Sequence, residues 1–190
     1  MVDLSGELAR HMALHILAMN LLAPALAYGW FRARDQNGPP PVGPFAAAGL
    51  QIAFLWGWHV PAAMEAAASA PLIGMAMHVS LFLSALLFWQ AIIGNVERPP
   101  WHAVAAMLVT GKLFCLLGIL LVFAPRTLYG PVMLHTGMPA GSGLADQQTA
   151  GMIMVIACPL TYVLGSIVIV RRWFMAEERA NGWRLGRPEP

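Results

Sequence analysis

Residues 101–124 read WHAVAAMLVTGKLFCLLGILLVFA, an apolar run that contains one Lys, Lys112, and no Arg, Asp or Glu. About 20 apolar residues in a helix span roughly 30 Å, which is the thickness of the hydrocarbon core of a bilayer. The rest of the chain has the same character, because 58% of its 190 residues are hydrophobic and 11% are charged, against roughly 25% charged residues in a soluble domain. The sequence therefore predicts a membrane protein.

Five such apolar runs use more than half of the chain. Because backbone polar groups in lipid must be paired within their own segment, we expect each run to be a helix. The predicted fold is all-α, a polytopic membrane bundle of five helices in one domain over residues 1–174, with a short, solvated, weakly structured tail at 175–190. The predicted spans are residues 11–29, 43–68, 72–94, 101–124 and 149–170.

The composition also excludes several classes of protein. Five spans leave little chain for a separate catalytic domain, and two cysteines do not make a disulfide scaffold. A net charge of +2 gives no reason to expect nucleic-acid binding. The chain has no Cys-X-X-Cys-His motif, which excludes covalent attachment of a c-type haem.

The basic residues predict the orientation of the bundle, because cytoplasmic loops carry the excess of Lys and Arg. With five spans, the first loop, the third loop and the C-terminal tail share one side. The basic residues on that side are Arg32, Arg34, Arg98, Arg171, Arg172, Arg179, Arg184 and Arg187. The other side has Arg10 and Arg126. We therefore expect the N-terminus outside and the C-terminus in the cytoplasm.

In this orientation, four histidines share one layer near the outer face. His11 and His15 are one turn apart on the first span, and His59 and His78 lie toward the outer ends of the next two spans. At about 1.5 Å per residue, all four lie within roughly 15 Å of the outer boundary. Polar side chains inside a bilayer usually turn to the bundle interior and pair or bind a ligand there. We expect these imidazoles to converge.

Convergent imidazoles bind copper, zinc or haem iron, and the thioether of Met selects soft ions such as Cu(I). The predicted metal ligands are His11, His15, His59 and His78, and the predicted ion is Cu(I). The secondary candidates are Met12, Met19, Met75, Met77, Glu65 and Asp146. Two alternatives stay open: bis-His ligation of haem b, and hydrogen bonds between helices with no ligand at all.

The remaining polar side chains allow more than one interpretation. Asp146, at the start of the fifth span, either caps that helix or contributes to the site. Lys112 lies near mid-membrane, so we expect it to have a partner or to be neutral. Cys115 and Cys158 are either apolar packing residues or a shared thiol site. His102, at the entrance to the fourth span, and His135, in an outer loop, are expected to be solvated, with a mobile entry ligand as the alternative for His135.

Short motifs in a fixed order connect the histidine positions. They are HMALH at 11–15, WHVP at 58–61, His78 followed by FLSALLFW at 82–89, and LADQQTAG at 144–151. Together they resemble the bacterial cytochrome c oxidase assembly proteins of the CtaG type. The resemblance carries His11, His15, His59 and His78 over as site residues, whereas many relatives have a further His where this chain has Gly74.

The resemblance implies a non-enzymatic protein of the bacterial plasma membrane. Its expected role is to supply copper to the dinuclear copper centre of an oxidase subunit, by ligand exchange with that subunit or with a periplasmic carrier. Because ligation needs neutral imidazoles, copper occupancy is expected to fall below about pH 6. The alternatives are a b-type cytochrome that exchanges electrons with quinone, and a metal-free adaptor that docks the oxidase.

Overall fold

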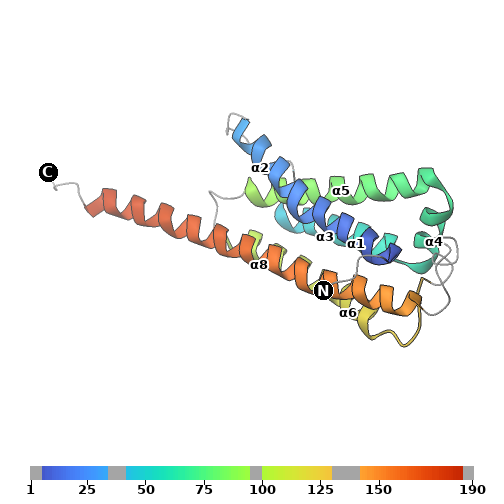
Figure 1. The fold of residues 1–190 in the computed structure, drawn as a ribbon. Helices are drawn as coiled ribbons and strands as arrows, with labels where there is room; N and C mark the ends of the chain where they lie inside the picture. Colours follow the sequence, from blue (N-terminus) through green and yellow to red (C-terminus); the bar gives the residue numbers. More distant parts are fainter. Residues whose placement is uncertain (1–5, 34–41, 95–99, 130–141, 186–190) are drawn as a thin grey trace.

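The computed structural model describes residues 6–33, 42–94, 100–129 and 142–185. The regular elements in these ranges are helices and no strand occurs among them, which confirms the all-α prediction. In chain order they are α1 (Glu7–Leu17), the π-helical turn η1 (Ala18–Leu22), α2 (Ala23–Ala33), α3 (Pro44–Trp58), α4 (Pro61–Ser69), α5 (Pro71–Ile93), α6 (Trp101–Phe123) and α8 (Ser142–Leu185). Figure 1 shows an elongated bundle, from which the C-terminal part of α8 projects.

Four stretches are long and apolar enough to cross a membrane, namely Glu7–Ala33, Pro71–Ile93, Trp101–Phe123 and Gly143–Arg179. The predicted count of five spans is therefore wrong for the described residues. The predicted span at 43–68 is divided into α3 and α4, and α3, with 15 residues, is only about 22 Å long. It packs against α5 and α6 within the bundle. The orientation of the bundle in the membrane stays a prediction.

Pro61 explains the break between α3 and α4. Proline has no backbone N–H, and its ring disfavours helical geometry in the residue before it. Val60 is accordingly extended, with φ −65° and ψ 134°, and Pro61 begins α4. His59 therefore caps α3 at a bend, and is not an interior residue of a continuous helix.

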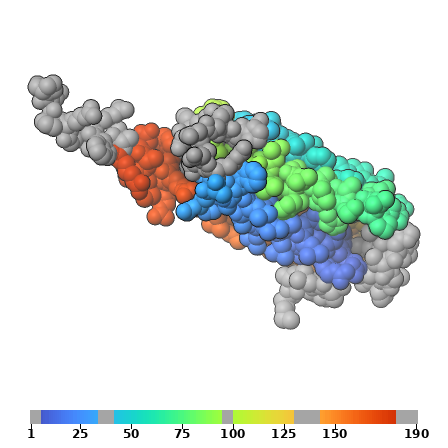
Figure 2. Space-filling model, turned by 90° about the horizontal axis from the view of Figure 1, so that it is seen from above, coloured from blue at the N-terminus to red at the C-terminus, as the bar shows by residue number. Residues whose placement is uncertain are grey.

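The helix α8 is longer than the sequence predicts. It has 44 residues, and so contains the predicted span at 149–170 and extends beyond it. Residues 176–180 read AEERA, and these residue types favour helix even when they are exposed. The predicted tail at 175–190 is thus helical as far as Leu185, and Figures 1 and 2 show this part of α8 leaving the bundle.

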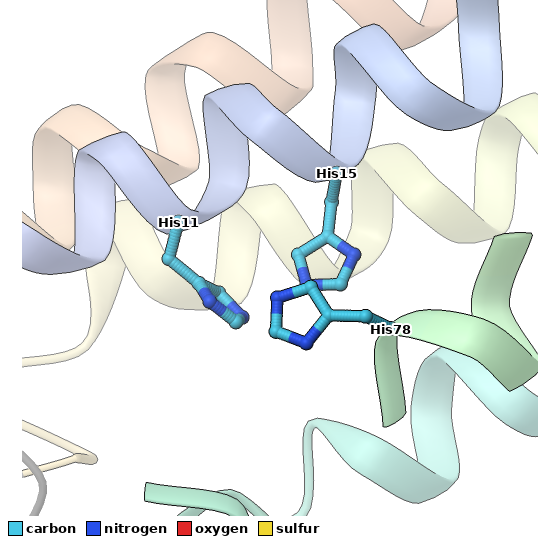
Figure 3. Close-up of side chains that lie close together, drawn as sticks. All are labelled: His11, His15 and His78. Atoms are coloured by element: carbon cyan, nitrogen blue, oxygen red, sulfur yellow. The ribbon is translucent and has the colours of Figure 1, made fainter. Parts of the chain in front are cut away.

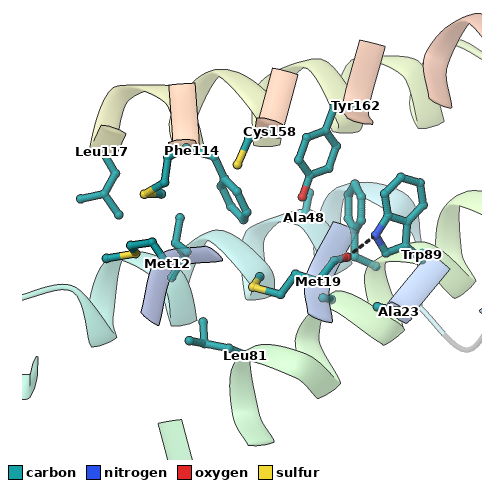
Figure 4. Close-up of a cluster of buried hydrophobic side chains, with 14 of the residues drawn as sticks. Met12, Met19, Ala23, Ala48, Leu81, Trp89, Phe114, Leu117, Cys158 and Tyr162 are labelled. Carbon is teal, nitrogen blue, oxygen red and sulfur yellow. Dashed lines mark hydrogen bonds between the residues drawn. The ribbon is translucent and has the colours of Figure 1, made fainter. Parts of the chain in front are cut away.

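A π-helical turn interrupts the first membrane helix between α1 and α2. A π turn changes the regular i to i+4 hydrogen bonding and places one extra residue in the turn. Met19 and Asn20 are adjacent in the sequence, yet both are buried in this turn. The Met19 carbonyl accepts a hydrogen bond of 2.9 Å from Trp89 Nε1 on α5 (Figure 4). The turn therefore presents two consecutive side chains to the core.

Two glycines allow α6 and α8 to approach closely. A Cβ atom at Gly151 would lie 2.6 Å from the Gly118 carbonyl oxygen, and one at Gly118 would lie 2.9 Å from the Gly151 carbonyl oxygen. Small residues at such a crossing bring helix backbones into van der Waals contact, which is a main source of helix association in lipid.

We expect Gly151→Ala to lower the free energy of unfolding by about 1–3 kcal/mol, because the added methyl group must push α6 and α8 apart. Thermal unfolding of the detergent-purified protein measures this effect. Gly49→Ala is the matched control, since a Cβ there meets no atom within 4 Å, and it is expected to be neutral or to stabilise α3 by up to about 1 kcal/mol. Equal destabilisation by both substitutions would contradict the close-crossing explanation.

Candidate metal centre

Four histidines converge at the end of the bundle where α1 and α5 begin. The ring centroids of His11 and His15, both on α1, are 4.3 Å apart. The His78 ring, from α5, lies 5.4 Å from His11 and 4.7 Å from His15, and His59 lies 6.4 Å from His15. Figure 3 shows the rings of His11, His15 and His78 facing one another between the two helices. The structure thus brings together the four imidazoles, and their role as ligands stays a prediction.

Three of these side chains have the spacing of a metal site. His11, His15 and His78 each offer a ring nitrogen, and these atoms lie within 4.8 Å of one another. Two nitrogens on one ion are at most about 4 Å apart, because each metal–nitrogen bond is about 2 Å long. The rings would therefore have to move closer together for all three nitrogens to bind one ion.

Backbone hydrogen bonds determine which nitrogen of two of the histidines is free. His59 Nδ1 lies 2.6 Å from the Leu55 carbonyl oxygen, and His78 Nδ1 lies 2.6 Å from that of Gly74. Because a carbonyl oxygen only accepts, each Nδ1 carries the proton and each Nε2 keeps its lone pair. Metal-binding histidines in proteins are held in this way, with one nitrogen on a backbone or carboxylate acceptor and the other on the ion.

Three of the Nε2 atoms are buried without a hydrogen-bond partner in the described part of the chain. They belong to His11, His15 and His59. An unpaired polar atom in a low-dielectric interior costs about 1–3 kcal/mol, so proteins rarely leave such atoms without a ligand or water. This cluster of free nitrogens therefore fits a bound ion.

Two cavities lie on either side of the histidine group. The first, here called the outer cavity, has a volume of about 180 Å³ and opens at the exposed side chain of His78; it is also lined by Glu7, His11, Met64, Met77 and Tyr129. The second, here called the inner cavity, has about 20 Å³ and lies in the core; its lining includes Met12, His15, Met19, Asn20, His59 and Cys158. The histidines thus separate the surface from a small buried space.

The secondary candidates divide into two groups. Met77 lines the outer cavity, and Met12 and Met19 line the inner one. Met75 is 58% exposed and Glu65 is also exposed, and neither lines the outer or the inner cavity. Residues two positions apart on a helix are about 200° apart around its axis, so Met75 and Met77 cannot both face the histidines.

Residues 41–176 match the family described as cytochrome c oxidase caa3 assembly factor. This match covers more than half of the chain. The chain belongs to that family. Searches of curated proteins and of solved structures find no significant match. Membership indicates that this assembly factor takes part in the assembly of cytochrome c oxidase and associates with it.

The matched region covers only part of the assembly factor's histidine group. It contains His59, His78 and Asp146, and it begins after α1, which carries His11 and His15. The metal-site assignment of the two α1 histidines therefore depends on their position in the structure and on the short HMALH motif.

Asp146 of the assembly factor is a helix cap, although not of its own helix. Its Oδ2 accepts a hydrogen bond from the Leu8 backbone N–H and its Oδ1 accepts one from Ala9, both at 2.9 Å. From α8 it thus pairs the free amides at the N-terminus of α1 and complements the positive end of that helix dipole. Of the two interpretations of Asp146, the cap of its own span is not formed, because the carboxylate holds the first turn of α1, next to His11; its contribution to the site stays a prediction.

Tyr129 is a site residue that the sequence interpretation missed. Its hydroxyl donates a hydrogen bond of 2.8 Å to the His59 carbonyl oxygen, and burial raises the pKa of Tyr129 to about 12. The hydroxyl therefore stays protonated and holds the bend after α3. Tyr129 lies in an irregular connection with no periodicity, so no sequence signal could have found it. Glu7 lies one turn before His11, and this helical spacing could have indicated that it lies near the site.

The other polar residues have simpler positions. Lys112 is exposed at the middle of α6, and no ion pair with it occurs among the described residues. Cys115 and Cys158 are both free thiols; Cys115 is half-buried, and Cys158 is buried at the inner cavity. His102 stacks on Trp101, with 3.4 Å between ring centroids. His135 lies outside the described residues.

Proposed function

We propose that this assembly factor binds Cu(I) at the histidine centre and delivers it to the dinuclear copper centre of an oxidase subunit. The observation that supports this most directly is the group of three ligand nitrogens within 4.8 Å of one another. Met64 and Met77 line the adjoining outer cavity, and thioethers favour Cu(I) over harder ions. No substrate bond is made or broken, because the ion moves by ligand exchange.

The positions of the charged residues support delivery on the outer side of a bacterial plasma membrane. The histidines lie at the end of the bundle where α1, α5 and α8 begin, whereas Arg32, Arg171 and Arg172 lie toward the opposite end, where α2 ends and α8 leaves the bundle (Figure 1). Basic residues favour the cytoplasmic side. A copper centre that faces outward could then exchange with the oxidase subunit or with a periplasmic carrier.

The geometry favours copper over haem b. The rings of His15 and His78 are stacked, with an interplanar angle of 17° and centroids 4.7 Å apart, and His11 packs edge-on against both rings. A bis-His haem needs its two imidazoles on opposite faces of a porphyrin, with the iron and the macrocycle between them. These three rings leave no such gap.

Metal analysis and a visible spectrum of the detergent-purified protein test the proposal. We expect copper to be retained under reducing conditions and no Soret band to appear. A strong Soret band would instead establish the cytochrome alternative. Oxidase assembly that survives replacement of all four histidines, in a protein that binds neither copper nor haem, would establish the metal-free adaptor.

A further inference from the structure

The inner cavity has an unusual concentration of sulfur for its size. Its volume is about 20 Å³, and its lining includes four sulfur-bearing side chains that are each at least 97% buried, Met12, Met19, Met154 and Cys158. Figure 4 shows Met12 and Met19 reaching into the core from the first helix and Cys158 reaching in from α8. A thiol and several thioethers are the donors that soft ions such as Cu(I) prefer.

Three residues around this space also carry buried polar atoms without partners. Asn20 Oδ1, His15 Nε2 and His59 Nε2 are buried and form no hydrogen bond with any described atom, and all three residues line the inner cavity. Unpaired buried polar atoms are uncommon in folded proteins, so three of them on residues around one cavity favour an occupant close by. The cavity is large enough for one small occupant, since a single water needs about 10–15 Å³.

From this juxtaposition we infer that the inner cavity is a second Cu(I) site, in series with the histidine centre. The inference rests on the proposed function, since it assumes that Cu(I) is the cargo. Cys158 provides a thiolate, the buried methionines provide thioethers, and His15 or His59 completes the ligand set. As the ion binds, the Cys158 thiol loses its proton to solvent and a copper–sulfur bond forms, with no change in oxidation state.

Charge explains why a cysteine is suited to this depth. A Cu(I) ion bound only by neutral imidazoles and thioethers carries one positive charge, which is costly in a low-dielectric bundle. A Cu(I)–thiolate pair is neutral. Asn20 Nδ2 donates to Cys158 Sγ at 3.8 Å, an outer contact of the kind that orients a metal-binding sulfur.

His15 and His59 connect the inner site to the histidine centre. His11 and His78 line the outer cavity, and His15 and His59 line the inner one. The His15 ring lies 4.7 Å from His78 and 6.4 Å from His59. An ion held by His11, His15 and His78 can therefore pass inward while it keeps His15 as a ligand.

Anaerobic Cu(I) titration of the full chain in detergent, against a chromophoric competitor, tests the inference. We expect about two Cu(I) per chain and an ultraviolet copper–thiolate absorption band. Cys158→Ser should bind about one ion and lose the band. The matched control is Cys115→Ser, on α6 and outside the inner cavity, which should keep both ions and the band. Circular dichroism and gel filtration verify that each variant is folded.

The outcomes separate this inference from the proposed function. One bound ion without a thiolate band in the wild-type protein, or a band that persists in folded Cys158→Ser, overturns the inner site and leaves the histidine centre intact. His78→Ala should lose one ion and keep the band. A different result would contradict the histidine centre. In that case the wild-type protein would bind one Cu(I), its copper–thiolate band would depend on Cys158, and His78→Ala would change neither the number of bound ions nor the band.

Discussion

Replacing His15 with alanine is expected to weaken Cu(I) binding by the purified protein at least tenfold, a loss of about 1.4 kcal/mol or more in binding free energy. The reason is the central position of this ring. The centroid of its ring lies 4.3 Å from that of His11, 4.7 Å from that of His78 and 6.4 Å from that of His59. His15 can therefore share an ion with any of the other three histidines, and its loss removes that shared ligand. Competition titration with a Cu(I) chelator measures the change.

His102→Ala is the control for this experiment. His102 is also an imidazole on a membrane helix, but it stacks on Trp101 at the start of α6, whereas the proposed copper site is near the start of α1. It should bind Cu(I) with wild-type affinity. If His15→Ala and His102→Ala retain the same affinity as the wild-type protein, the histidine centre is not the copper site.

Replacing Asp146 with alanine is expected to lower the free energy of unfolding by about 2–4 kcal/mol. The carboxylate accepts the Leu8 and Ala9 backbone N–H groups, and each buried donor that loses its partner costs about 1–3 kcal/mol. Because these bonds hold the first turn of α1, His11 should also lose its position, and Cu(I) affinity should fall together with stability. Thermal unfolding and chelator competition on the same preparation measure both effects.

Two further substitutions test whether the Asp146 effect comes from capping. Glu177→Ala removes an exposed carboxylate elsewhere on α8 and should change stability by less than about 0.5 kcal/mol. Gly6→Ala should destabilise the same contact from the other side, because its Cβ would lie within 2.8 Å of both Asp146 carboxylate oxygens. An Asp146→Ala protein as stable as the Glu177→Ala protein would show that the cap is unimportant.

The helices could be predicted from the sequence because a membrane span depends on local properties. Length and hydropathy in a window of about 20 residues decide whether a segment is stable in lipid, so the boundaries of α5 and α6 agree with the predicted spans within about one residue. The break at Pro61 also depends on local sequence, because a proline disfavours helical geometry in the residue before it, here Val60. The error at 43–68 came from giving composition more weight than the proline.

For the four histidines, the sequence could predict only a shared depth in the membrane. Counting residues from the span ends places His11, His15, His59 and His78 at a similar depth, because the rise per residue in a helix is constant. Depth does not say which way a side chain points around its helix. The same count also placed Met75 and Glu65 in the layer, and the structure leaves both exposed.

The sequence by itself determined that this chain forms apolar helices and that its histidines lie at one depth, since both properties follow from residue type and spacing along a helix. The tertiary structure alone decided that Asp146 caps a helix 137 residues away, that Tyr129 holds the bend after His59, and that Cys158 lies at a small cavity beside Met12 and Met19. These contacts depend on how helices rotate and pack against one another. That arrangement is decided by the combined packing of all the helices, and no single stretch of sequence specifies it.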